Sequence, residues 1–131
     1  MERTAINPVA WSQEFGYSQG TLVEGAHRTL HISGQTAMSA SGAPEHEGDP
    51  GAQLALAVDN LERVLEAAGM TLADLVRVGV FATGLDALLP HYGVLAGRLA
   101  AAGVSPAMTL VEVSRLAVPG QVVEIEGTAV A

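Results

Sequence analysis

The stretch that decides the fold reads DPGAQLALAVDNLERVLEAAG and spans residues 49–69. Asp49 followed by Pro50 is the pattern of a helix N-cap and a first helical residue. Apolar residues then recur at spacings of four, three, four and three, at Leu54, Val58, Leu61, Leu65 and Ala68. This periodicity predicts an amphipathic helix with one buried face, and Gly69 is typical of the residue that ends such a helix.

Downstream of this helix, strand-like and helix-like segments alternate. The predicted elements are a strand, a helix and two further strands, at residues 75–83, 86–102, 107–113 and 122–130. Asp86 is expected to cap the second helix and Gly103 to end it, and Pro90 lies near the start, where proline is least harmful. Pro119 and Gly120 mark a turn between the last two strands.

Upstream of the first helix, residues 15–38 contain two β-favouring runs with a glycine-containing connection, which predicts a hairpin. Leu30 and Ile32 alternate with polar neighbours, the period-2 pattern of a strand with one buried face. Residues 39–50 are rich in Ser, Gly, Pro and Glu, so they are expected to form an exposed loop.

The element order is therefore β-β-α-β-α-β-β, in a single domain that spans residues 1–131. A hairpin at each end favours an α+β fold with a mixed β-sheet and two helices packed on one face. Only 15% of the residues are charged and 49% are hydrophobic, so few charges remain for the uncovered face of the sheet. Self-association through that face is expected.

Composition argues against several functional classes. The absence of cysteine excludes disulfides, thiolate catalysis and cysteine-ligated metals, and hairpin and loop positions account for the four histidines, so no metal site is expected. The formal net charge is -8 and the six basic residues include no lysine, which argues against a nucleic-acid partner. No apolar run approaches the roughly 20 residues of a membrane span, so a soluble cytoplasmic protein is predicted.

Short motifs occur in order along nearly the whole chain. They are GYSQ at 16–19, SGQ at 33–35, DNL at 59–61, LEAAG at 65–69, VRVGVF at 76–81, SPA at 105–107, VEVSRL at 111–116 and VEIEGTA at 123–129. Each motif alone is unspecific, but the ordered set resembles the RidA family, also called the YjgF/YER057c/UK114 family.

This resemblance implies a chorismate-mutase-like α+β fold that assembles as a homotrimer, with a cleft between each pair of neighbouring subunits. Active members of the family hydrolyse reactive enamines and imines, such as 2-aminoacrylate, to ammonia and a 2-keto acid, and they use no metal or organic cofactor. Some members carry an older label as ribonucleases or translation inhibitors.

The key residue of the family is an arginine directly after the Pro-Ala of the strand at 107–113, and here that position is Met108. The family's arginine holds the substrate carboxylate in a two-pronged ionic contact. A thioether carries no positive charge and cannot replace it. The substitution marks a divergent member and argues against ordinary 2-imino-acid deaminase activity.

Four other positions correspond to the family's site. Tyr17 matches a tyrosine, and Gly34 matches a glycine whose backbone approaches the ligand. Glu124 matches the carboxylate that positions or activates the attacking water, and Tyr92 stands where the family has an asparagine. The site is expected to keep its general-base candidate, while Met108 and Tyr92 favour a more neutral or apolar ligand.

Each of these residues also has a plainer interpretation. Glu124 could be a solvent-facing strand residue, Tyr17 a packing residue, and Met108 simple hydrophobic lining. Arg115 is interpreted as a structural arginine near a turn, rather than as a substitute for the missing cation.

Three functional hypotheses follow from these residues. The first is a cofactor-free enzyme, a hydrolase, deaminase or tautomerase, acting on a small enamine, imine or related carbonyl compound. The second is a non-catalytic trimer that binds a small ligand or serves as a scaffold. The third is the endoribonuclease or translation-inhibitor activity, against which the acidic balance and the absence of lysine argue.

Overall fold

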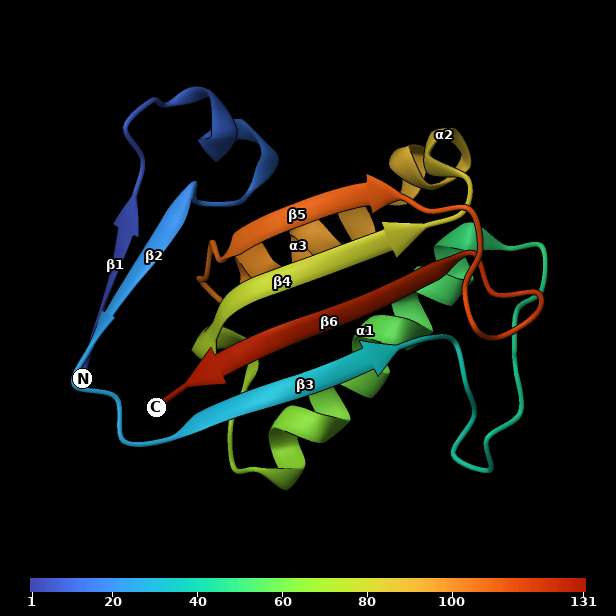
Figure 1. Ribbon diagram of the computed structural model, residues 1–131, viewed down its shortest axis with the longest axis horizontal. Coiled ribbons are helices and arrows are strands. Elements are labelled where there is room, and N and C mark those ends of the chain that lie inside the picture. The colour runs from blue at the N-terminus through green and yellow to red at the C-terminus, as the bar shows by residue number, and fades with distance from the viewer.

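The computed structural model describes residues 1–131, and its strands form two separate sheets (Figure 1). The smaller sheet is an antiparallel pair, β1 (Glu2–Ile6) and β2 (Gly20–Glu24). The larger sheet has the order β3–β6–β4–β5 and consists of β3 (Thr29–Gln35), β6 (Val123–Val130), β4 (Leu75–Ala82) and β5 (Ala107–Glu112). It is mixed, because β4 and β5 are parallel whereas β6 is antiparallel to both β3 and β4.

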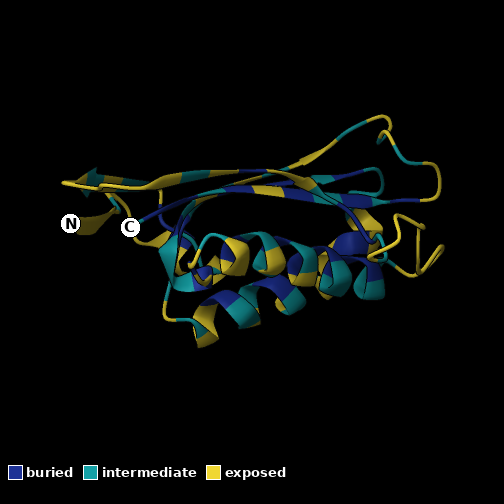
Figure 2. Ribbon diagram, turned by 90° about the horizontal axis from the view of Figure 1, so that it is seen from below, coloured by how far each residue is buried: buried dark blue, intermediate teal, exposed yellow.

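The helices cover one face of the larger sheet (Figure 2). They are α1 (Pro50–Ala67), α2 (Leu85–Leu88) and α3 (Gly93–Ala101), with short 3₁₀ helices η1 (Trp11–Phe15), η2 (Leu72–Asp74) and η3 (Leu89–His91). The predicted α+β class, with a mixed sheet and helices packed on one face, is confirmed. No helix combines the length and the apolar character that crossing a membrane would require.

The first helix forms where its sequence predicts. The Asp49 carboxylate accepts a hydrogen bond from the Ala52 N–H (3.1 Å), and Pro50 opens α1. The stripe residues within α1, Leu54, Val58, Leu61 and Leu65, face the sheet and are buried, whereas Ala68 caps the helix and is half-buried. Gly69 follows the helix with a φ of +71°, a left-handed conformation that glycine adopts without strain. All of the predicted start, face and end signals are therefore confirmed.

The second predicted helix is instead three short pieces, α2, η3 and α3. Pro90 lies in η3, where its missing N–H and ring interrupt the α-helical bonding. The prediction that Asp86 caps this helix is wrong, because Gly84 is the residue before α2 and Asp86 lies within its first turn. The Leu85 N–H is instead bonded by the Glu112 carboxylate at the end of β5 (3.0 Å).

The two predicted terminal hairpins do not form. β2 pairs with β1 rather than with β3, and β3 pairs with β6. β5 pairs in parallel with β4, so it is not the neighbour of β6. Between β2 and β3 the chain turns at Gly25 (φ +70°), and the His27 and Arg28 N–H groups donate to the Ala131 carbonyl at 3.0 and 2.9 Å. These bonds tie the connection to the residue after β6 and leave β3 beside β6.

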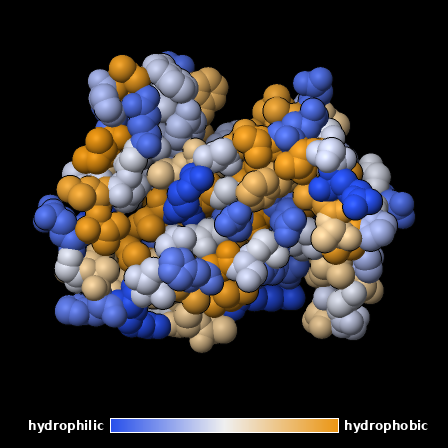
Figure 3. All heavy atoms as spheres, in the orientation of Figure 1, coloured by the Kyte–Doolittle hydropathy of each residue, from blue (hydrophilic) through white to orange (hydrophobic).

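The two faces of the larger sheet differ in chemistry. Val78, Val80 and Ile125 point to the helices and are buried. The alternate residues of the same strands point to the open face, where Arg77 donates to the Thr109 hydroxyl (2.9 Å). Figure 3 views this open face and shows hydrophilic and hydrophobic residues interspersed across it.

Two buried glutamines hold the loops at one end of the larger sheet. Gln53 accepts from the Val122 N–H (2.8 Å) and donates to the carbonyls of Gly120 (2.9 Å) and His46 (3.1 Å). Gln121 accepts from the Ala37 N–H (2.8 Å) and donates to the Ala37 carbonyl (3.2 Å). Because the amide oxygen and nitrogen of both side chains are hydrogen-bonded to the backbone, the loop before α1 and the loop before β6 are fixed to each other.

Candidate functional site

Three of the predicted site residues meet in one cavity at the outer edge of β5. Tyr17, Tyr92 and Met108 line a space of ≈ 320 Å³ in which every lining residue is aromatic or aliphatic. The other lining residues are Trp11, Phe15, Leu89 and Leu110. We call this cavity the aromatic cup.

One wall of the cup is a cluster of aromatic rings from η1 and the residues after it. The rings of Trp11 and Phe15 meet edge-to-face with centroids 6.5 Å apart, and Trp11 and Tyr17 do the same at 6.4 Å. Gly16 ends η1 with a φ of +79°, and this turn brings Tyr17 back toward Trp11. The three rings therefore form one wall although they come from a short, irregular segment.

Tyr92 joins this wall to β5. Its hydroxyl donates to the Phe15 carbonyl (3.1 Å) and lies 3.8 Å from the Met108 sulfur. Burial raises the pKa of Tyr92, and the nearby Tyr17 phenol raises it further. The hydroxyl therefore stays protonated at neutral pH and is committed to the protein's own backbone, so Tyr92 shapes the cup rather than transferring protons.

Met108 lies on the helix-covered face of the sheet, where it pairs with buried Val78. No charged side chain lines the cup. A ligand held there is recognised by apolar and aromatic contact, and a carboxylate inside the cup would find no cation.

Glu124 and Gly34 lie in a second cavity, on the open face of the sheet. This space of ≈ 380 Å³ is lined by Gly34, Phe81, Val113, Arg115, Leu116, Ala117, Glu124 and Glu126. We call it the charged cleft. Glu124 reaches it because it pairs with Phe81 of β4, whose side chain also points away from the helices.

Gly34 fits closely against Glu124. A Cβ atom at Gly34 would lie 2.7 Å from Glu124 Cδ and would clash with Oε1, so only glycine lets this carboxylate lie across β3. The register of β3 against β6 shifts between Ile32 and Gln35, an irregularity typical of a place where a strand re-aims its side chains. Glu124 makes no hydrogen bond or ion pair within the chain, so its oxygens are free to bind water or a ligand.

The cup and the cleft share no lining residue and lie on opposite faces of the sheet. The chain therefore brings the five predicted site residues together as two groups, three in the cup and two in the cleft. A site that uses both groups on one ligand needs the cup of one copy and the cleft of another. An inter-subunit cleft stays a prediction at this point.

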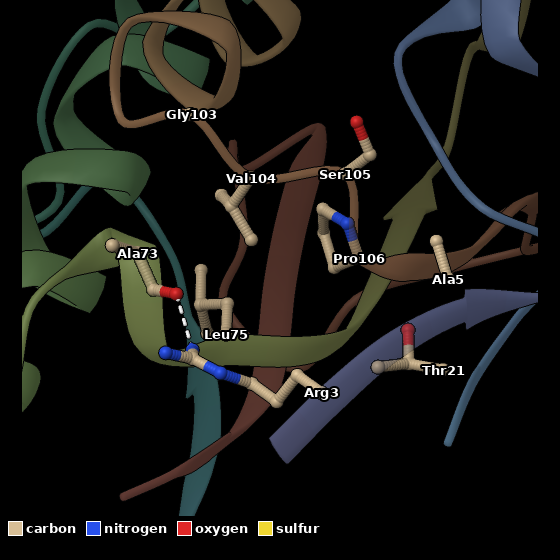
Figure 4. Close-up of a pocket in the computed structure, with 9 residues that line it drawn as sticks. All are labelled: Arg3, Ala5, Thr21, Ala73, Leu75, Gly103, Val104, Ser105 and Pro106. Carbon is tan, nitrogen blue, oxygen red and sulfur yellow. Dashed lines mark hydrogen bonds between the residues drawn. The ribbon is translucent and has the colours of Figure 1, made fainter. Parts of the chain in front are cut away.

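A third cavity, ≈ 460 Å³, contains none of the predicted site residues. It lies between the β1–β2 hairpin and the start of β4, and Arg3 is its one charged lining residue (Figure 4). The Arg3 guanidinium donates to the Ala73 carbonyl and lies 3.7 Å from the Asp74 carboxylate. These contacts fasten the hairpin to the larger sheet.

Residues 16–20 read GYSQG, which fits the pattern of a serine-hydrolase elbow. Ser18 is only 2% exposed, and the segment after it is strand β2 rather than the helix that an elbow requires. The structure likewise contains no group of three or more His, Cys, Asp or Glu side chains that could hold a metal ion.

Sequence reasoning missed most of the cup. Trp11, Phe15, Leu89 and Leu110 were not among the predicted site residues, although they supply more of its lining than the predicted ones do. A signal was present, since three of the five aromatic residues of the chain lie between positions 11 and 17.

Comparison with known proteins gives a consistent result. Residues 8–131 match the family described as Endoribonuclease L-PSP. The chain is 34% identical to YyfB from Yersinia pestis, a Rid-family protein of unknown function, with 100% of both chains covered and a TM-score of 0.85. It is 28% identical to the YjgF gene product of E. coli, covering 95% of this chain and 92% of that one, with a TM-score of 0.70.

A third similar structure is E. coli TdcF with bound serine, which is 25% identical. The alignment covers 97% of this chain and 93% of TdcF, with a TM-score of 0.71. No curated protein matches the chain.

Proposed function

This chain belongs to the Endoribonuclease L-PSP family, which includes RidA and the YjgF/YER057c/UK114 proteins, and on that premise we propose that it acts on a small enamine, imine or related carbonyl compound with an apolar substituent. One observation carries the proposal, the convergence of Tyr17, Tyr92 and Met108 in a cup without charge. Binding pockets for small molecules are mostly apolar with a few placed polar groups, and a volume of ≈ 320 Å³ suits a substituent such as a phenyl ring.

Glu124 is the group proposed to activate water. In hydrolysis of an imine, the oxygen of water bonds to the imine carbon, and Glu124 accepts a water proton and delivers it to the nitrogen. The same carboxylate then passes the proton of the new hydroxyl group to the nitrogen as the carbon–nitrogen bond breaks, which releases ammonia and leaves a carbonyl. The unpaired Glu124 oxygens and their close approach to Gly34 support this role.

Assembly as a homotrimer would join the two groups of residues. The cup and the cleft lie on opposite faces of one chain, and Trp11 and Phe15 on the rim of the cup are 58% and 54% exposed. A neighbouring copy that covers this rim would bring its own Glu124 to the ligand. Sedimentation of the native protein tests this, and a mass of one chain at micromolar concentration would contradict it.

The first experiment measures ammonia release from imines generated in situ by an amino-acid oxidase. We expect the imine of phenylalanine to be hydrolysed at least about tenfold faster, as kcat/KM, than the imine of alanine, which is the tautomer of 2-aminoacrylate, because burying a phenyl ring in the cup contributes about 1.5–3 kcal/mol. Met108→Arg is expected to reverse this preference, because it places a cation among apolar walls, whereas the control Met108→Leu is expected to keep it.

The alternative is a non-catalytic trimer that binds a small ligand, which the replacement of the family's arginine by Met108 favours. Trp11 is the single tryptophan of the chain and lines the cup, so its fluorescence reports binding without turnover. Saturable quenching by apolar ligands with no ammonia release from any imine would select this alternative. TdcF with bound serine supports a small-molecule ligand in either case.

A further inference from the structure

Arg115 differs from the other arginines of the chain. Five of the six are bound within the protein: Arg3 to Ala73 and Asp74, Arg28 to Ala68, Arg63 to Asn60, Arg77 to Thr109 and Arg98 to Asp59 and Glu62. Arg115 makes no hydrogen bond and no ion pair. The structural role expected from its position near a turn has no contact to support it.

Arg115 lines the charged cleft together with Glu124 and Glu126, yet it pairs with neither. The cleft therefore presents a guanidinium and two carboxylates, each with unused hydrogen-bonding groups, around the apolar side chains of Phe81 and Leu116. A ligand with an anionic end and an N–H donor at the other end is complementary to such an arrangement.

The segment that carries Arg115 is held at both ends. The Val113 N–H donates to the Ala82 carbonyl (2.8 Å), and the Thr83 N–H donates to the Val122 carbonyl (3.1 Å). Gln53 bonds the Gly120 carbonyl and the Val122 N–H, as described above. The backbone of Arg115 is thus placed before a ligand arrives, which lowers the entropy that binding must offset.

We infer that Arg115 is a carboxylate-binding residue of the site, and that it supplies from the cleft the cation that Met108 does not supply in the cup. The inference rests on the proposed function and narrows it. The ligand is then a 2-imino or 2-keto acid with its carboxylate on Arg115, its reactive carbon beside Glu124 and its apolar substituent in the cup of the neighbouring copy. Arginine suits this task because its planar guanidinium can hold both carboxylate oxygens.

A matched pair of ligands tests this directly. Phenylpyruvate and phenylacetone share the benzyl group and the ketone, and they differ only in a carboxylate against a methyl group. Trp11 fluorescence gives the Kd of each. Native protein is expected to bind phenylpyruvate about tenfold more tightly, and Arg115→Gln to remove this difference while the Kd of phenylacetone stays within about twofold. Arg115→Lys, which keeps a point charge, is expected to keep part of the preference.

The control variant is Arg77→Gln, which removes an equal charge from the same open face outside the cleft. Arg77→Gln is expected to keep the full preference for phenylpyruvate. If Arg77→Gln loses this preference, the net charge of the open face is responsible for it, not Arg115. If Arg115→Gln binds phenylpyruvate as native protein does, the inference is wrong and the proposed function stands. If native protein binds neither ligand, the proposed role of the cup fails with it.

Discussion

The aromatic cup and the charged cleft lie on opposite faces of the same four-stranded sheet and have opposite chemistry. In the cup, the rings pack against one another and the Tyr92 hydroxyl is bonded to the protein's own backbone. In the cleft, Glu124, Glu126 and Arg115 have no partner within the chain. The polar hydroxyl of Tyr92 in the cup is used within the chain, whereas the charged groups of the cleft are not. The two regions share no lining residue and can therefore be changed separately, and each change below alters one region and leaves the other intact.

The largest effect is expected from Glu124→Gln, which keeps the shape of the side chain but removes its ability to accept a proton. General acid–base groups contribute typically about 10²–10⁴-fold, so imine hydrolysis is expected to fall at least about 100-fold. Phenylacetone binding to the cup, followed by Trp11 fluorescence, is expected to be unchanged. Glu126→Gln, two residues along the same face, is the control, and an equal loss in both variants would show that Glu124 has no special role.

A smaller effect is expected from Gly34→Ala. The new methyl group would lie 2.7 Å from the position of Glu124 Cδ and would clash with Oε1, so the carboxylate must shift within the cleft. A misplacement of about 1 Å can cost about 10²-fold, but the Glu124 side chain is flexible and can recover part of its position, so we expect kcat to fall about tenfold.

Gly79→Ala is the control for Gly34→Ala. Its Cβ would meet Glu126 Cγ at 3.1 Å, so it crowds the other glutamate of the same face. If both variants lower kcat equally, crowding of the sheet rather than displacement of Glu124 explains the loss.

The smallest effect is expected from Tyr92→Phe, which removes the hydrogen bond to the Phe15 carbonyl and should lower the free energy of unfolding by about 1 kcal/mol at neutral pH. Folding raises the pKa of Tyr92, so its stabilising contribution is fully present below the ordinary tyrosine pKa of about 10 and is lost as the pH rises through the higher folded value. Urea unfolding at a series of pH values should show the native protein losing its advantage over Tyr92→Phe in alkali. A constant difference across the series would contradict this explanation.

The parts of the fold that sequence could predict are those with local signals. The N-cap at Asp49, the apolar stripe of α1 and Gly69 all act within a few residues, and all three predictions are confirmed. The bounds of β4, β5 and β6 were also predicted to within a residue or two, whereas β1 at Glu2–Ile6 was not predicted. The pairing partners of the strands were not predicted. Thr29 pairs with Val130 across most of the sequence, and no local pattern specifies that pairing.

The same distinction, between features with local sequence signals and features set by distant pairing, applies to the candidate site. Resemblance to a family pointed to Tyr17, Tyr92 and Met108, which line the cup together. It also pointed to Gly34 and Glu124, which contact each other in the cleft. That the two groups face opposite sides of the sheet follows from the register of β4 with β5 and β6, which single residues do not encode. Arg115 was interpreted as structural because it stands where the family has a structural arginine near a turn, and only the full set of contacts within the chain shows that its guanidinium has no partner there.

The position of β6 between β3 and β4 bears on how the chain folds. β6 is the latest strand in the sequence, yet it is the only partner of β3 in the larger sheet and separates it from β4. During synthesis, β3 and the apolar face of α1 must therefore wait for residues 123–130 before the sheet can close. Such non-local pairing slows folding and leaves unpaired edges exposed in the meantime. We expect nascent chains that stop before residue 123 to depend on chaperones, whatever the ligand of the finished protein.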